Sequence, residues 1–262
     1  MSAIKLAIQL ASLRLPLKAA LQTAARLGAT AVVIDARREL KPRELSVTGR
    51  RQLKKMLDDL RLKVCAVSFP TRHGYGDIDR LDQRVAATKE AMDFAYSLGA
   101  TVVVNQVGRV PDDPDDQQWA TMLEALHDIG RHSQLCGATL AAETGSESGS
   151  DLKRLIDALP DGSIGVTFDP GNLIVNGHSA SDALPLFASH VLHVQARDGV
   201  RDLARGRGLE VTLGRGSVDF PELLGTLEDA GYRGYYTIVR DASNDPVREI
   251  GDAIMYLKQL NG

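Results

Sequence analysis

The sequence is poor in the features that mark several common protein classes. Its 262 residues include only two cysteines, Cys65 and Cys136, and 5% aromatic residues. Both cysteines lie among apolar or small residues, so we expect buried free thiols and not a disulfide. No uninterrupted apolar run reaches the roughly 18 residues of a membrane-spanning helix, which argues against a membrane protein.

The chain also lacks a strong excess of charge of either sign. Its formal net charge is −3 and its sequence pI is about 6.1. These values argue against a nucleic-acid-binding protein that relies on a general basic field. The N-terminal residues show no basic region followed by a long apolar core and a small-residue cleavage site. We therefore expect a cytoplasmic protein that acts on a small molecule and binds neither nucleic acid nor a membrane.

Several short catalytic motifs are missing as well. The chain contains no Gly-x-Ser-x-Gly, no His-Glu-x-x-His and no Cys-x-x-Cys, so serine hydrolases, zinc proteases and redox thiol proteins have no support. No Gly-x-Gly-x-x-Gly follows a first strand, and Gly214-Arg215-Gly216 alone is weak evidence for phosphate binding. The acidic run at 111–116 is typical of a solvated loop and helix N-terminus.

What the chain does contain is a regular alternation of buried strands and amphipathic helices. We predict eight strands, at 4–10, 30–36, 62–69, 101–107, 140–144, 164–168, 191–195 and 235–239. The predicted helices are 17–27, 47–60, 81–98, 119–136, 151–159, 181–188, 220–230 and 247–260. Eight strand–helix units with no break in composition predict one α/β domain over residues 1–262, a single (β/α)8 TIM barrel.

Polar residues follow three of the apolar strands at corresponding positions. The passages are LAAET at 140–144, IGVTFDPGN at 164–172 and VLHVQARD at 191–198. Active sites of such barrels lie at the C-terminal ends of the strands, which points to Glu143, Asp169 and Gln195. Because side chains alternate along a strand, Gln195 shares its face with His193 and Arg197.

Other residues are placed near the same end of the barrel by their loops. His73 and Tyr75 lie in a long predicted loop at 70–79, where a substrate contact is expected. Asn105 or Gln106 ends the fourth strand, and we favour Asn105 as a substrate contact. Asp241 has the same strand parity as residue 239 and faces the same way.

The order of these motifs resembles the xylose isomerase-like TIM-barrel superfamily. Glu143 follows the fifth strand, DPGN the sixth, and HVQARD forms the seventh, before LGRGSVDF and GYRGYYTIV. The resemblance covers essentially the whole chain and is strongest over 141–241. The superfamily includes sugar isomerases and epimerases, inosose dehydratases, hydroxypyruvate isomerase and endonuclease IV, and its relatives often form homo-oligomers.

The resemblance implies a divalent metal held by Glu, Asp, His and Glu from strands five to eight. Glu143 and Asp169 match the first two ligands, but Gln195 stands at the histidine position and Val239 at the last glutamate. Glu143, Asp169 and Gln195 would remain as ligands for Mg, Mn, Co or Zn. Since half of the set is changed, we expect the metal to be weakly held or absent.

The resemblance also implies a sugar or polyol substrate and proton transfer next to a carbonyl, in an isomerase, an epimerase or a related dehydratase. Glu143 would be the base, and Arg197 would hold a developing oxyanion or else only neutralise Glu143 and Asp169. The expected substrate contacts are His73, Asn105, Asn172, His193, Gln195 and Asp241. His193 is alternatively a core residue and Asn172 a turn residue. The competing hypothesis is a non-catalytic descendant that binds a sugar or a partner protein. A nuclease is the weakest of the three hypotheses, because few histidines lie near the site.

Overall fold

Eight parallel strands form a closed barrel in the computed structural model, which describes residues 4–202 and 207–260. Their order around the barrel is β1-β10-β7-β6-β5-β4-β3-β2. The strands are β1 (Lys5–Gln9), β2 (Ala31–Asp35), β3 (Lys63–Ser68), β4 (Val102–Asn105), β5 (Thr139–Glu143), β6 (Gly165–Phe168), β7 (Val191–Ala196) and β10 (Tyr235–Ile238). The predicted TIM barrel is confirmed, with each strand within a few residues of its expected place.

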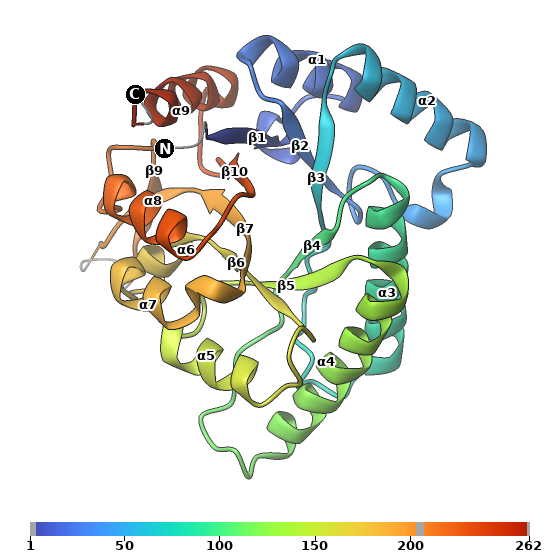
Figure 1. Cartoon of the computed structure of the whole chain (residues 1–262), viewed down its shortest axis with the longest axis vertical. Helices are drawn as coiled ribbons and strands as arrows, with labels where there is room; N and C mark the ends of the chain where they lie inside the picture. Colours follow the sequence, from blue (N-terminus) through green and yellow to red (C-terminus); the bar gives the residue numbers. More distant parts are fainter. Residues whose placement is uncertain (1–3, 203–206, 261–262) are drawn as a thin grey trace.

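The predicted helices surround the barrel (Figure 1). They are α1 (Leu17–Leu27), α2 (Val47–Asp59), α3 (Leu81–Ser97), α4 (Gln117–Cys136), α5 (Gly149–Asp157), α7 (Ala180–Phe187), α8 (Phe220–Asp229) and α9 (Pro246–Leu260). Three short 3-10 helices, η1 (Leu10–Leu13), η2 (Pro42–Glu44) and η3 (Ala188–His190), were not predicted. Helix α1 ends at Gly28, whose φ of 87° suits a residue without a Cβ atom.

Two further elements next to the barrel opening also escaped prediction. The DPGN passage begins the short helix α6 (Pro170–Val175), because Asp169 caps it and Pro170 occupies its first position. Strands β8 (Asp198–Val200) and β9 (Leu209–Val211) form a small antiparallel sheet. Each has three residues, too few for an alternating pattern. Residues 203–206, within the loop between them, lie outside the described part of the chain.

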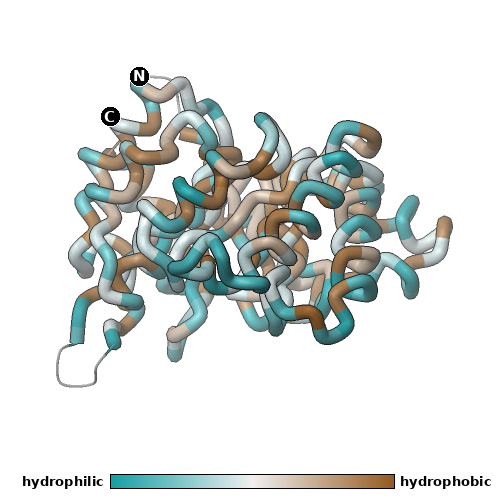
Figure 2. The backbone as a smooth tube through the Cα atoms, turned by 90° about the horizontal axis from the view of Figure 1, so that it is seen from below, coloured by the Kyte–Doolittle hydropathy of each residue, from teal (hydrophilic) through white to brown (hydrophobic). Residues whose placement is uncertain are grey.

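Apolar side chains form two layers. Val33, Ala66, Val102, Val104 and Ala141 form a small cluster inside the barrel, while a larger cluster fills the space between strands and helices. Along the helices, hydrophobic and hydrophilic residues alternate in short segments, as in Figure 2. The position of Ala141 inside the barrel confirms the predicted parity of β5, which also directs Glu143 inwards.

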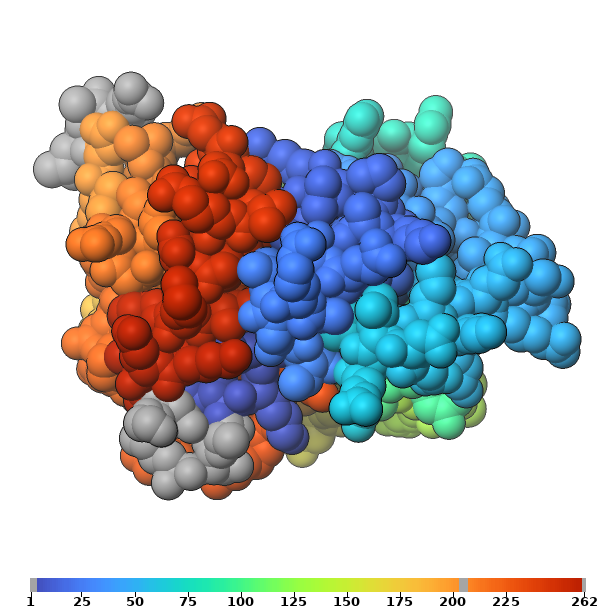
Figure 3. All heavy atoms as spheres, turned by 90° about the horizontal axis from the view of Figure 1, so that it is seen from above, coloured from blue at the N-terminus to red at the C-terminus, as the bar shows by residue number. Residues whose placement is uncertain are grey.

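The first and last parts of the chain lie side by side and close the ring. Strand β1 pairs with β10, and helix α9 contacts α1. The space-filling view of Figure 3 shows red C-terminal segments against blue N-terminal ones. In the described part of the chain, no helix combines the length and the apolar character that crossing a membrane requires.

The cysteines only partly match the prediction. Both are free, as expected. Both are partly buried, so the expected burial is met only in part. Cys136 is the last residue of α4, where the chain turns towards β5, and this terminal position leaves one side of the residue open.

Candidate active site

A group of charged and amide side chains occupies the opening of the barrel at the C-terminal ends of β5, β6 and β7. Glu143 ends β5, Asp169 follows β6, Gln195 lies in β7 and Arg197 comes directly after it. Asp241 joins them from the segment after β10. The sequence predicted this grouping, and the contacts below show how its members are connected.

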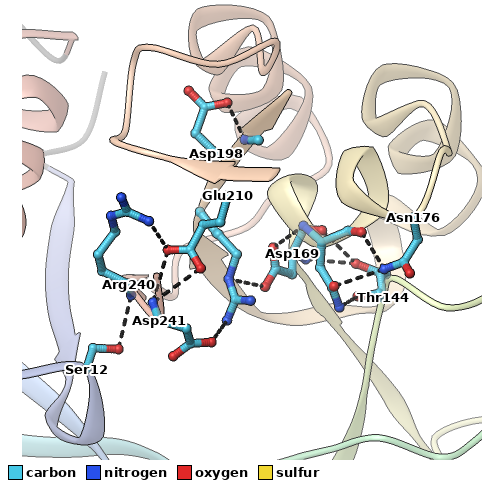
Figure 4. Close-up of polar contacts among 11 residues, drawn as sticks. Ser12, Thr144, Asp169, Asn176, Asp198, Glu210, Arg240 and Asp241 are labelled. Carbon is cyan, nitrogen blue, oxygen red and sulfur yellow. Dashed lines mark hydrogen bonds and ion pairs between the residues drawn. The ribbon is translucent and has the colours of Figure 1, made fainter. Parts of the chain in front are cut away.

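Asp169 is completely buried and held by several donors. Its Oδ1 accepts a hydrogen bond from the backbone N–H of Asn172 at 2.8 Å, which caps α6. Its own N–H donates to Oγ1 of Thr144 at 2.8 Å (Figure 4). Its Oδ2 lies 3.1 Å from Nε of Arg197. The carboxylate therefore has a fixed orientation, set by α6 on one side and by Arg197 on the other.

Arg197 connects two carboxylates across the opening. Besides its contact with Asp169, its Nη2 donates to Oδ2 of Asp241 at 2.9 Å. Burial lowers the pKa of Arg197, but the charges of Asp169, Asp241 and Glu143 outweigh this and raise it above the usual value. Arg197 is therefore a permanent cation, with 14% of its side chain exposed to the opening.

Gln195 bridges the two carboxylates that the sequence proposed as metal ligands. The hydrogen-bonding pattern assigns its amide nitrogen to their side, where it donates to Asp169 Oδ2 at 2.7 Å and to Glu143 Oε1 at 3.0 Å. A glutamine offers both a donor and an acceptor, and here it is the donor that faces the carboxylates. Gln195 thus ties Glu143 to Asp169 from within the barrel.

Glu143 is the group in this network whose charge responds to pH near neutrality. Burial, and next the negative charge of Asp169, raise its pKa to about 7, while Arg197 opposes the shift. The side chain of Gln106 opposes the shift as well. A carboxylate with such a pKa is matched to taking up and returning protons at neutral pH.

The donor set does not fit a tightly held divalent metal. Asp169 already accepts hydrogen bonds from Asn172 and Gln195 and pairs with Arg197, while Gln195 directs its nitrogen, which is no ligand, towards the carboxylates. A metal ion would also meet the charge of Arg197 at close range. Buried Val239, at the position of the last expected ligand, supplies no donor atom.

His193 and Asn172 take the structural alternatives that the sequence left open. His193 is buried, and its Nε2 lies 2.8 Å from Oγ1 of Thr237, one layer below Gln195. Burial lowers its pKa to about 3, so the ring is neutral. Asn172 donates from Nδ2 to the carbonyl of Thr144 at 2.9 Å and accepts a hydrogen bond from Asn176. Its amide thereby closes the turn that begins α6.

Two expected substrate contacts are placed elsewhere and require correction. Tyr75 is fully buried, and its hydroxyl shares a hydrogen bond of 2.8 Å with that of Thr88 on α3. Asn105 faces away from the barrel interior, where its Nδ2 donates to the carbonyl of Phe69 at 2.6 Å. Because Val104 faces inwards, strand alternation turns Asn105 outwards and brings Gln106 to Glu143.

His73 and Asp241 are exposed residues in the segments that follow β3 and β10. The His73 side chain is 64% exposed, and its Nδ1 lies 3.1 Å from Oδ2 of Asp77 in the same loop. The side chain of Asp241 is 58% exposed, and it orients Arg197 through the ion pair described above. Substrate contacts by these two residues stay predictions.

Sequence reasoning missed the contacts that hold the segment after β10 in place. Arg240 pairs with Glu210 of β9 at 2.6 Å and with Glu249 of α9 at 2.7 Å. Glu210 also accepts from the backbone N–H of Asp241 at 3.0 Å (Figure 4). Glu210 lies 30 positions before Arg240 and 31 before Asp241, and no local pattern indicates these two contacts. They fix the strand end from which Asp241 reaches Arg197.

Asp198 has a similar supporting role next to the site. Its buried carboxylate accepts hydrogen bonds from four backbone N–H groups, those of Gly199, Gly214, Gly216 and Val218. A carboxylate that gathers several backbone donors fixes a loop. It holds the loop after β9 against β8.

The raised pKa values predict how stability depends on pH. Burial is the largest cause that raises the pKa of Glu143 from 4.5 to about 7 and that of Asp169 from 3.8 to about 6. The folded state therefore binds more protons than the unfolded state between about pH 4 and 7, and the free energy of unfolding falls as pH rises through this window. Glu143→Gln removes one of these buried charges. Urea denaturation should show the variant about 1–3 kcal/mol more stable than the wild type at pH 8, and equal to it near pH 4. A difference of the same size at both pH values would contradict the assignment.

Comparisons with known proteins agree with this architecture. The sequence profile described as xylose isomerase-like TIM barrel matches residues 21–260. An inosose dehydratase of Bacillus thuringiensis (strain Al Hakam) is 22% identical over 224 residues, which cover 74% of each chain.

Two solved structures have the same fold. A xylose isomerase domain protein from Planctomyces limnophilus superposes with a TM-score of 0.83 at 25% identity, covering 92% of both chains. A xylose isomerase-like TIM-barrel protein from Mycobacterium smegmatis, solved in complex with magnesium, has a TM-score of 0.78 at 17% identity. It covers 99% of this chain and 96% of its own.

Proposed function

The chain belongs to the xylose isomerase-like TIM-barrel family, and from this premise we propose that it moves a proton at the carbon next to a carbonyl group of a sugar or polyol. The observation that carries the proposal is Glu143, an inward-facing carboxylate at the barrel opening whose pKa is raised to about 7. A structural role alone would not favour a partly buried carboxylate beside Asp169, because two such charges repel each other.

Glu143 acts as the base in the proposed reaction. Its carboxylate takes the proton from the C–H bond, whose electron pair forms a C=C bond while the carbonyl becomes a negatively charged oxygen. Delivery of the proton to the former carbonyl carbon, while the proton of the adjacent hydroxyl passes to the negative oxygen, gives an isomer. Protonation of the original carbon from the opposite face, by water, gives an epimer. Loss of the hydroxyl group from the next carbon as water, with the proton held by Glu143, re-forms the carbonyl and gives a dehydrated product. The three reactions share the first step, so the proposal is made for that step.

Arg197 holds the negative oxygen in this scheme. A fixed cation at the opening stabilises an enediolate as a metal ion would, without needing the ligands that Gln195 and Val239 replace. Asp169 and Asp241 hold the guanidinium in place, and Gln195 keeps Glu143 beside it. The Mg2+ named for the Mycobacterium smegmatis protein belongs to that protein, and the proposed step here needs no metal.

A non-catalytic sugar-binding protein is the second candidate. It is favoured by one observation: Asp169 already accepts from Gln195 and forms an ion pair with Arg197, so these groups are engaged within the chain. A network whose charges are already paired binds a polyol through its outer groups without reacting. The two candidates differ in whether a C–H bond of the ligand is ever broken.

Exchange of hydrogen for deuterium distinguishes them without knowledge of the product. Purified protein is incubated in D2O with ketoses, inososes, sugar phosphates and sugar acids, with and without EDTA, and deuterium incorporation is followed by NMR. We expect exchange at the carbon next to the carbonyl of one substrate class, at an equal rate in EDTA. Thermal stabilisation by a sugar without exchange would favour the binding protein, and neither effect would overturn both candidates. Loss of exchange in EDTA would show that a metal takes the place assigned to Arg197.

A further inference from the structure

Three side chains with metal-binding atoms meet on the outside of the barrel, in the seam between α3 and α4. Asp93 comes from α3, and His132 and Cys136 come from α4. The Nε2 atom of His132 lies 2.8 Å from Oδ1 of Asp93, and the three donor atoms all lie within 4.8 Å of one another. The two helices run side by side in Figure 1 and contact each other along their lengths.

The spacing on α4 brings two of these residues to one face. His132 and Cys136 are four residues apart, so their side chains lie one above the other on the helix. Asp93 occupies the facing position on α3, one turn beyond Lys89, which pairs with Asp128 at 2.7 Å. The seam therefore carries a Lys–Asp pair at one turn and the Asp–His–Cys group at the next.

The surroundings of the group favour a cation. Cys136 is the last residue of α4, where the aligned peptide dipoles place partial negative charge. The nearby cations Lys89 and Arg131 are both paired with Asp128, at 2.7 and 3.1 Å. His132 and Cys136 are partly exposed, so an ion can enter from solvent.

We propose that Asp93, His132 and Cys136 form a binding site for a transition metal of the Zn2+ class, separate from the barrel opening. One sulfur, one imidazole nitrogen and one carboxylate oxygen are a donor set that Zn2+ and Co2+ accept and that Mg2+ does not prefer. Tetrahedral binding needs donor atoms about 3–4 Å apart, given metal–ligand bonds of about 2.0–2.3 Å. Small side-chain movements within the observed 4.8 Å achieve this, and water takes the fourth position.

The position of the site indicates a structural role for the bound metal. Helix α4 ends at Cys136 and leads directly into β5, whose opposite end carries Glu143. A metal here ties the end of α4 to α3 at the side of the barrel away from the candidate active site. The proposal is independent of the proposed reaction, and it stands even if Glu143 has no catalytic role.

Titration with Co2+ tests the site, because a Co2+–thiolate bond produces a charge-transfer absorption that oxygen and nitrogen ligands do not. We expect one equivalent of Co2+ to give this band in the wild type and Zn2+ to displace it. Cys136→Ser should abolish the band, and His132→Ala should weaken binding at least tenfold. Cys65→Ser removes the other thiol and Glu143→Gln alters the barrel opening, so both controls should bind as the wild type does.

Circular dichroism of the metal-free variants checks that each one is folded. The proposal is overturned if folded wild-type protein shows no charge-transfer band, or if the band survives in Cys136→Ser. It is equally overturned if Cys65→Ser removes the band while Cys136→Ser keeps it, since the thiolate would then come from inside the barrel. Loss of Co2+ binding in Glu143→Gln would place the metal at the barrel opening and reject the site between α3 and α4.

Discussion

Glu143→Gln is expected to lower the rate of C–H exchange about 10²–10⁴-fold, the usual contribution of a positioned base. The substitution keeps the shape of the side chain and removes only its ability to accept the substrate proton. Its side-chain oxygen still accepts the hydrogen bond from Gln195, so the network around Asp169 stays in place. The measurement is the rate of deuterium incorporation into the substrate class identified by the screen, at saturating substrate.

Glu147 provides a matched control for this substitution. It lies four residues further along the chain, in the loop after β5, is buried, and has a pKa that burial raises to about 7. Its carboxylate contacts the hydroxyl of its neighbour Ser146. Glu147→Gln therefore removes a similar group without touching Gln195 or Arg197, and exchange should stay within about threefold of the wild type. Full activity in Glu143→Gln, or equal losses in both variants, would reject Glu143 as the base.

The pH dependence of the exchange rate is a second test of Glu143 as the base. Glu143 must be deprotonated to act as the base, and burial together with the charge of Asp169 raises its pKa to about 7. The exchange rate at low substrate should thus rise with pH and level off above about 7. An acid limb near pH 4.5 would indicate a carboxyl group with an ordinary pKa, which does not describe Glu143 in this structure.

Periodicity made the inner face of each strand predictable. The positions of Glu143, Asp169, Gln195 and Arg197 follow from the ends of three apolar segments and the alternation of side chains along them. The same alternation separates Asn105 from Gln106: Val104 faces inwards, so Asn105 faces outwards. The sequence did not distinguish the two because the inner face of β4 was not fixed by a charged residue at its end.

The contacts that these residues make with other parts of the chain could not be predicted from the sequence. Arg197 reaches Asp241 across 44 positions of the sequence, and Arg240 reaches Glu210 across 30. Such contacts depend on how β7, β9 and β10 pack together, and local residue patterns do not indicate that packing. Tyr75 illustrates the same limit: its polar, glycine-rich loop indicates exposure, yet its ring is buried and its hydroxyl meets α3.

Arg197→Met tests the second half of the proposed mechanism. Removing a charged group that stabilises an oxyanion costs about 10²–10³-fold in rate, and we expect a loss of this size in C–H exchange. Methionine keeps much of the length and apolar stem of the side chain but leaves Asp169 without its cation. Arg197→Lys retains the charge at a single point and should recover part of the rate.

A purely structural role for Arg197 would also lower activity. The pH profile distinguishes such a role from stabilisation of the oxyanion. Arg197 opposes the rise in the pKa of Glu143, and its removal should move the acid limb of the profile to higher pH. Loss of folded protein would lower the amplitude of the profile and leave its midpoint unchanged. If Arg197→Met exchanges as fast as the wild type with an unshifted profile, the oxyanion must be held by another group. Added Mg2+ or Zn2+ would then be the first candidates to restore a metal-dependent mechanism.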